Sequence, residues 1–335
     1  MSANLFFPNH HEGLGLQVLT GVLAGLGVIG QLAGRADAVG DTMLLARELE
    51  YVSAQTYDVL YDPIIGRQVV DFETVPEGAD FFSYDMYDGY AMVEWITNWA
   101  STVGNADTFK NRTTKQMRSF GGHYMYSDQD LRAAAFAGNG RTLDRERARH
   151  VRVGHEQKID DLIATGDSTR SIEGLLNNSN IPTIVRAGSH TWTGGSVTVA
   201  DIHADLTKLA QAPEQASAGN FVADTLLLPL SQKPLLSQPY STLQGKSILA
   251  VWLEGQEDIK TVLWWKRANT ASAIGGPRAF AFKRSKDVMK FLMAFDYREK
   301  PPQIEARAFV VHTEARVGGL CLVYPFGAAK MDLDA

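Results

Sequence analysis

Residues 127–167 read SDQDLRAAAFAGNGRTLDRERARHVRVGHEQKIDDLIATGD, and this stretch predicts a long, mostly helical rod with one joint. Ser127 is a favourable N-cap, and Asp130 three residues later resembles a capping box. Gly138-Asn139-Gly140 interrupts the helical pattern, because glycine is costly inside a helix and common at joints. The sequence therefore predicts a short helix, a joint and a second, longer helix.

The second helix is expected to start at the cap Thr142, to run to about Ala164 and to end at Gly166. Its apolar positions are sparse, and they are Leu143, Ala148, Val151, Ile159, Leu162 and Ile163. Such a helix packs on one narrow side and presents its other faces to water or to a neighbouring chain. This pattern is more typical of a structural subunit than of an enzyme pocket.

The composition of the chain limits the kinds of protein to which it can belong. Its 335 residues suggest about two domains, and a hydrophobic content of 45% allows a sizeable core. The formal net charge of −6 argues against a dedicated nucleic-acid binder. Cys321 is the only cysteine, which excludes an intrachain disulfide and a cysteine metal site and fits folding in a reducing cytoplasm.

Residues 14–34 form a nearly uncharged, glycine-rich segment near the N-terminus. Its length would span a bilayer, and its glycine spacing occurs in packed membrane helices. Polar residues interrupt it, however, and no Lys or Arg precedes Arg35, so a secretory signal would lack its basic region. We expect a mobile apolar arm that contacts another subunit.

The first third of the chain is expected to hold a helix over 41–60 and then a β-hairpin. The hairpin would pair strands at 68–75 and 81–87 across a turn at 76–78. Because a two-stranded ribbon is marginal alone, its aromatic side chains should contact another subunit, namely Phe72, Phe82, Tyr84 and Tyr87. A strand at 117–126 would lead into the rod.

The remaining segments predict a mixture of helix and strand. Thr198 and Asp201 resemble a second capping box, opening a helix that should end near Pro213. Strands are expected at 225–230, 247–253, 261–267 and 278–283, and residues 287–295 fit either helix or strand. A closing hairpin would pair 306–313 with 319–324.

Metal or acid–base chemistry has five candidates on the long helix, which are Glu146, His150, His155, Glu156 and Asp160. His150 and His155 are five residues apart, unlike the H-E-x-x-H arrangement of zinc hydrolases. The favoured interpretation is a solvated, charged helix laced with arginines at 145, 147, 149 and 152. We therefore expect no catalytic, cofactor-binding or metal-binding residue.

Other motifs carry less weight. Gly25-x-Gly27-x-x-Gly30 matches the dinucleotide fingerprint literally, but no βαβ unit surrounds it. His10-His11 lies in the expected arm, and Cys321 suits a small core position. Residues 141–152 are basic with interleaved acids, which favours a solvated or subunit-contacting face and leaves contact with packaged nucleic acid as an alternative.

Several segments resemble a family of tailed-bacteriophage major capsid proteins with the Hong Kong 97-type fold. They are residues 46–57 (ARELEYVSAQTY), 126–135 (YSDQDLRAAA), 155–159 (HEQKI), 166–167 (GD), 174–178 (GLLNN) and 315–319 (ARVGG). The resemblance covers roughly residues 42–333.

This resemblance implies an α+β fold in four parts. Residues 1–60 would be the N-terminal arm and 61–115 the E-loop β-hairpin region. Residues 116–190 and 301–335 would form the peripheral domain with its spine helix, and 191–300 mostly the axial domain.

The resemblance also implies a function in assembly rather than catalysis. Hexamers and pentamers of this chain would close an icosahedral shell around double-stranded DNA, contacted non-specifically. Portal protein, and scaffold or decoration proteins, would be further partners, with no cofactor and no membrane. The protein would reside in the virion after assembly in the host cytoplasm. The alternatives are an encapsulin-like shell enclosing enzymes, a helix-based metal hydrolase using Glu146, His150 and His155, and a membrane-anchored protein.

The joint at Gly138-Asn139-Gly140 generates a first prediction. If one glycine needs a positive φ angle, alanine at both positions is strained, and the double variant Gly138→Ala/Gly140→Ala unfolds at a lower temperature and builds few or wrong-sized particles. Thermal melting of unassembled subunits and particle sizing measure the two effects. A more stable variant that builds normal shells would show a continuous helix instead.

Overall fold

The computed structural model describes residues 61–93, 95, 104–137, 143–188, 190–192, 197–241, 245–306 and 308–334. The elements named below lie in one compact unit, Pro63–Ala335. Several expectations lie outside the described residues, namely the arm, the helix at 41–60, the glycine joint and the cap Thr142.

The first sheet is built around one long strand. Its order is β1 (Asp71–Thr74), β11 (Met289–Glu299), β13 (Ala308–Leu322) and β12 (Gln303–Glu305), and β4 (Arg118–Ser127) also pairs with β13. The predicted closing hairpin is wrong, because its two halves belong to β13. Gly319 takes φ 79° and the β11–β13 register shifts there, so the chain passes through a β-bulge instead of a reversal.

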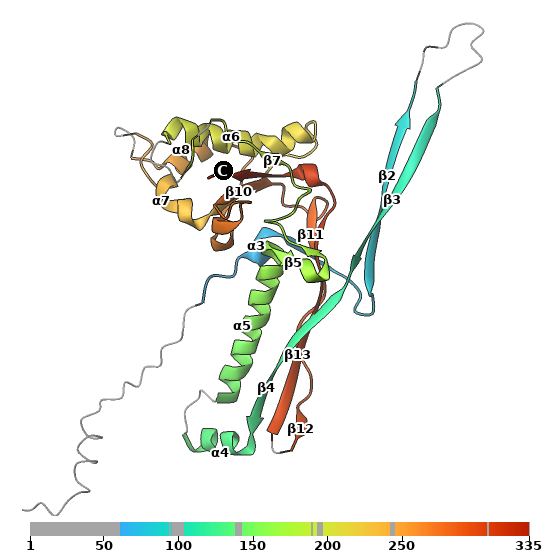
Figure 1. The fold of residues 1–335 in the computed structure, drawn as a ribbon, viewed down its shortest axis with the longest axis vertical. Helices are drawn as coiled ribbons and strands as arrows, with labels where there is room; N and C mark the ends of the chain where they lie inside the picture. Colours follow the sequence, from blue (N-terminus) through green and yellow to red (C-terminus); the bar gives the residue numbers. More distant parts are fainter. Residues whose placement is uncertain are drawn as a thin grey trace, which may run out of the picture. The chain divides into compact units, whose positions relative to one another are not determined.

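One face of this sheet carries the spine helix α5 (Leu143–Ala164), which follows α4 (Asp128–Ala137) (Figure 1). The capping box at Ser127 and Asp130 is confirmed by reciprocal hydrogen bonds of 3.2 Å each. Only the second half of α5 is deeply buried, through Ile159, Leu162 and Ile163. Gly166, with φ 72°, follows the helix end as predicted.

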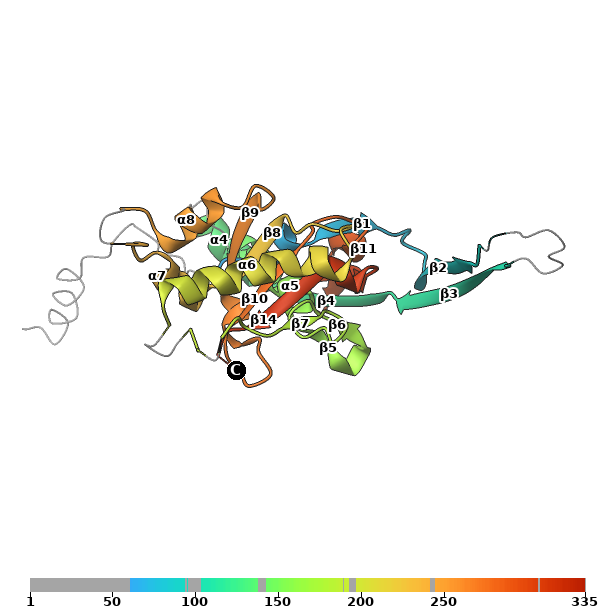
Figure 2. The same ribbon diagram turned by 90° about the horizontal axis from the view of Figure 1, so that it is seen from above.

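A two-stranded ribbon of β2 (Phe81–Ala91) and β3 (Ala106–Gln116) extends beyond this sheet (Figure 2). The predicted pairing of 68–75 with 81–87 is wrong. Residues Gly66–Val69 form the helical turn α3, and β1 runs parallel to β11. Burial decides this outcome, since Phe72 packs on Phe291 with ring centres 5.3 Å apart.

The second sheet has the order β7 (Thr183–Ile184), β14 (Ala328–Asp332), β10 (Arg278–Phe282), β8 (Thr225–Pro229) and β9 (Thr261–Trp265). Alternate side chains of β8 and β10 enter two separate cores. One core lies under α6 (Val199–Ala216) and α8 (Ile248–Glu254), and the other joins β11 and the end of α5.

Two predictions in this region need correction. The capping box at Thr198 is confirmed, but α6 continues past Pro213, which is buried in its last turn. Residues 247–253 form helix α8 rather than a strand. Ser247 caps its first turn, and Ile248 and Trp252, four residues apart, both face the core, which is helical spacing.

The remaining elements are short. They are β5 (Gly166–Asp167), η2 (Ser168–Arg170), β6 (Ile172–Glu173), η3 (Leu230–Gln232), α7 (Lys233–Leu236), η4 (Lys266–Thr270) and η5 (Pro325–Gly327). None of the helices in the described ranges is both long and apolar enough to cross a membrane.

The bulge in β13 generates a prediction about stability. A Cβ at Gly319 would lie 2.5 Å from Ile172 Cγ2, and φ is positive there, so Gly319→Ala should lower the free energy of unfolding by about 1–3 kcal/mol. Gly154→Ala is the matched control: its Cβ would meet nothing within 4 Å, and a helix interior favours alanine by about 0.5–1 kcal/mol. Urea unfolding of unassembled subunits measures both, and equal effects would contradict the assignment of strain to Gly319.

Candidate assembly surfaces

The base of the β2–β3 ribbon packs on its own subunit. Successive strand residues face opposite sides, and Phe82 and Tyr84 share one face of β2. Both pack against a small core that contains Met117, Leu292 and Cys321. These two aromatic side chains, and Phe72 on β1, are partly buried within their own subunit, whereas Tyr87 is 68% exposed. Contact of these four side chains with another subunit stays a prediction.

The same face of the ribbon continues outward without a cover. We call Met86, Tyr90 and Phe109 the outer ribbon face; the register places them on the side of Phe82. Tyr90 and Phe109 are 50% and 57% exposed, and their rings stack with centres 6.3 Å apart. Farther out, Val93 and Trp95 are 91% and 98% exposed. Asp88 and Asp107 lie directly opposite Phe109 and Tyr90 on the same face. The face therefore presents exposed aromatic side chains with a polar border, as interaction sites often do.

The opposite face of the ribbon carries charged and polar pairs together with two exposed aromatic side chains, Phe81 and Tyr87. Asp85 accepts a hydrogen bond from Arg112 at 2.7 Å and forms an ion pair with Lys110 at 2.6 Å. Arg112, followed by Lys110, lowers the pKa of Asp85. Ser83 and Thr114 hydrogen-bond across the strands at 2.9 Å. Since cross-strand pairs stabilise a two-stranded ribbon, these contacts support the observed register of β2 and β3.

The five candidate residues on α5 do not converge on one site. Glu146 and His150 lie on its accessible first half, whereas His155 and Asp160 are each only 5% exposed. Asp160 accepts a hydrogen bond from the Gly66 amide at 2.7 Å, and Glu156 binds Arg67 at 2.7 Å. The prediction of a solvated helix is therefore wrong for His155 and Asp160, which the sheet and α3 cover. In the parts of the chain described, no three His, Cys, Asp or Glu side chains are placed to hold a metal.

His155 lies between α5 and the sheet. Its Nε2 is 3.0 Å from Thr313 Oγ1, and its ring packs on Phe120 and Tyr297. Its Nδ1 is buried and has no hydrogen-bond partner. Burial lowers the pKa of His155, while Asp296 and Glu156 act in the opposite direction. The sequence pattern of charged neighbours gave no sign of this burial.

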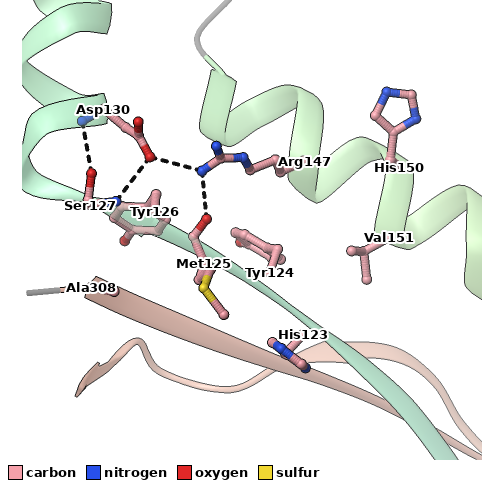
Figure 3. Close-up of a pocket in the computed structure, with 10 residues that line it drawn as sticks. All are labelled: His123, Tyr124, Met125, Tyr126, Ser127, Asp130, Arg147, His150, Val151 and Ala308. Atoms are coloured by element: carbon pink, nitrogen blue, oxygen red, sulfur yellow. Dashed lines mark hydrogen bonds and ion pairs between the residues drawn. The ribbon is translucent and has the colours of Figure 1, made fainter. Parts of the chain in front are cut away.

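A groove of about 620 Å³ lies between β4, α4 and the first half of α5 (Figure 3). Arg147 crosses it, donating to the Met125 carbonyl at 2.7 Å and to Asp130 at 3.1 Å. Val151 points toward β4, whereas His150 points away from it. Arg147, which was predicted to lie on a solvated face, thus holds α5 to β4.

The second sheet's region contains a buried carboxylate that sequence patterns did not single out. Asp205 is 0% exposed and accepts from the Ala187 amide at 2.6 Å and from Trp192 Nε1 at 2.8 Å. His190 Nε2 lies 2.8 Å from the same carboxylate. The sequence feature that could have indicated this burial is the position of Asp205 next to Leu206 on the apolar side of α6. Its role is to fix the segment before α6.

These surfaces define a subunit with a projecting ribbon that carries exposed aromatic side chains. The family model described as "Major capsid protein" matches residues 92–333, and the chain belongs to this family of capsid proteins. No curated protein sequence matches the chain.

Solved structures support the Hong Kong 97-type fold. The capsid of Myoviridae phage XM1 is similar with a TM-score of 0.75 at 14% identity, covering 86% of this chain and 97% of that one. A chain of Mycobacterium phage Adephagia gives a TM-score of 0.61 at 12% identity, over 89% and 99% of the two chains. A virus-like particle from Pyrococcus furiosus gives 0.52 at 13% identity, over 79% and 91%. The predicted fold class and the predicted family are confirmed.

His155 generates a prediction about pH. The fold favours the neutral imidazole, whereas an unfolded histidine titrates near about pH 6.5. The stabilisation is therefore fully present above about pH 6.5 and is lost as the pH falls through the lower, folded-state pKa. The free energy of unfolding of the wild type should decline over this range more steeply than that of His155→Gln, whose amide can still bond to Thr313.

Urea unfolding of unassembled subunits between pH 7.5 and pH 5 measures the difference. His203→Gln, on α6 and far from α5 in sequence, is the control and should follow the wild type. Parallel curves for the wild type and His155→Gln would contradict a buried, neutral His155.

Proposed function

We propose that many copies of this capsid protein form hexamers and pentamers that close an icosahedral head shell around the double-stranded DNA of a tailed bacteriophage. The observation that carries the proposal is the outer ribbon face, whose stacked Tyr90 and Phe109 are exposed on a ribbon with cross-strand polar pairs on its other side. The partner of this face would be a second copy of the chain, because in a shell of identical subunits a neighbouring copy lies beside every ribbon.

Burial of the outer ribbon face would favour assembly substantially. Tyrosine and phenylalanine side chains each present about 150–250 Å² of surface. With about half of each exposed, docking Tyr90 and Phe109 would contribute about 2 kcal/mol each at about 25 cal/mol per Å². Ordering and association oppose this gain, so each contact is modest, and the closed ring multiplies it.

The domain division that we propose is that of a Hong Kong 97-type capsid subunit. Residues 1–60 form the arm, 61–115 the E-loop region, 116–190 with 301–335 the peripheral domain, and 191–300 most of the axial domain. The two sheets support the last two assignments in part: β4 and β13 share the first sheet and β8, β9 and β10 the second, while β11, β7 and β14 cross the division. The extended ribbon supports the second.

The further partners follow from a role as head shell. We infer contacts with a portal protein and with scaffold or decoration proteins, and non-specific contacts with packaged DNA. The chain acts without enzyme activity or cofactor, assembles in the host cytoplasm and resides in the virion. An encapsulin-like shell would share the fold; the similarity to the capsid of phage XM1, with a TM-score of 0.75, supports the phage head.

Electron microscopy of the expressed full chain tests the proposal. Closed shells of uniform size, built from rings of six and five subunits, are the expected result. Persistent monomers at high concentration would contradict it. Particles purified from infected cells should contain DNA, and particles filled with a cargo enzyme would favour the encapsulin-like alternative.

The outer ribbon face generates a sharper prediction. The variant Tyr90→Ser/Phe109→Ser should give subunits that melt within a few degrees of the wild type but fail to close shells, because the lost side chains contact a neighbour rather than the core. Ser83→Ala/Thr114→Ala, on the opposite face of the same ribbon, is the matched control and should assemble. Particle yield by electron microscopy and light scattering reports the outcome, and normal shells from the double serine variant would refute the docking role.

A further inference from the structure

Two histidines face each other across the longest ladder of the first sheet. His123 on β4 is directly opposite His312 on β13, and their ring centres are 5.8 Å apart with 49° between the planes. The β4–β13 register runs without a shift from Ala308 to Val317, so the two backbones are fixed relative to each other. Such rigid strands position side chains more precisely than loops do.

The pair lies on the face of the sheet opposite α5. Gly122 and Thr313, the neighbours of the two histidines in sequence, face the helix: a Cβ on Gly122 would lie 3.7 Å from Val151, and Thr313 bonds to His155. Side chains alternate along a strand, so His123 and His312 point to the other side. His123 is exposed and His312 half-buried.

Neither imidazole has another polar partner. Within the described residues, no hydrogen bond or ion pair joins His123 or His312 to another group, and their ring contact with each other is the interaction found. The histidines at 155 and 190, in contrast, are each bound to a neighbouring side chain. The ring nitrogens of the pair are thus available to a ligand.

The spacing of the rings suits a single metal ion. Zinc holds an imidazole nitrogen at about 2.0–2.1 Å, and tetrahedral geometry then places two ring centres about 5–5.5 Å apart. The observed ring-centre distance of 5.8 Å is close to this range. Imidazole is a preferred ligand of Zn²⁺, Cu²⁺ and Ni²⁺.

The surroundings are polar and accessible. A shallow groove of about 530 Å³ contains both histidines, and it is also lined by Glu314 and Lys300. Glu314 lies on the same face two residues after His312, and its carboxylate forms an ion pair with Lys300 at 2.8 Å. Water can reach the groove, and the carboxylate offsets part of a bound cation's charge.

We propose that His123 and His312 form a two-histidine site for a divalent transition-metal ion of the zinc type, whose remaining positions are filled by water. An ion held there ties β4 to β13, so it stabilises the folded subunit through preferential binding to the native state. The site is independent of the ribbon and of shell closure, and no three-ligand cluster is required.

Titration of chelator-treated, full-length protein with Zn²⁺ tests the site by calorimetry at pH 7.5. The background carries His10→Asn/His11→Asn, which removes the only adjacent histidine pair in the sequence. We expect one zinc ion per subunit with a dissociation constant in the micromolar range, weakened at least tenfold by either His123→Asn or His312→Asn. The matched control His203→Asn should bind as the background does.

Thermal melting provides the second measurement. Zinc in 100-fold excess over the dissociation constant should raise the melting temperature of the background and of His203→Asn, but not that of either site variant. Equal melting temperatures without metal show that the site variants fold. Absence of saturable zinc binding, or binding that survives in His123→Asn, would overturn the proposal.

Discussion

The structure depends on the ladder between β4 and β13, in which Arg118–Ser127 pairs antiparallel with Ala308–Val317. These segments lie almost two hundred residues apart, so the ladder joins distant parts of the described chain. Everything characteristic of the subunit is attached to it. The spine helix α5 packs on one face, β11 extends the sheet through the rest of β13, and β3 leads directly into β4.

Local features of the fold could be predicted from the sequence, whereas the pairing of distant strands could not. Both capping boxes, at Ser127 and Thr198, were predictable because the cap and its partner are three residues apart. The fully buried strand β8 was visible as an apolar run. The pairing of β1 with β11 was not predictable, because it joins Asp71 to Lys290 and no local pattern specifies a partner at that distance. The same limit produced the error at β13, where two glycines read as a turn although the strand continues through a bulge.

The candidate surfaces show the same division. The aromatic character of residues 81–90 was evident, but which aromatic side chains remain exposed depends on where the sheet ends. Phe82 reaches the core and Tyr90, on the same face, does not. Likewise His155 and Asp160 read as surface charges, since their neighbours are charged, and only the approach of Thr313 and Gly66 makes them interior. Burial of a polar residue is a tertiary property, and its partners come from distant segments.

The continuity of β3 with β4 has a mechanical consequence. Only Met117, itself buried, separates the two strands, so ribbon and sheet share one nearly uninterrupted length of extended backbone. Tension along the ribbon reaches β4 parallel to its axis, while the hydrogen bonds of an antiparallel ladder lie perpendicular to it. The ten pairs of the β4–β13 ladder are then loaded together in shear rather than opened one after another. A pull on the ribbon is therefore resisted by all ten pairs of the ladder at once.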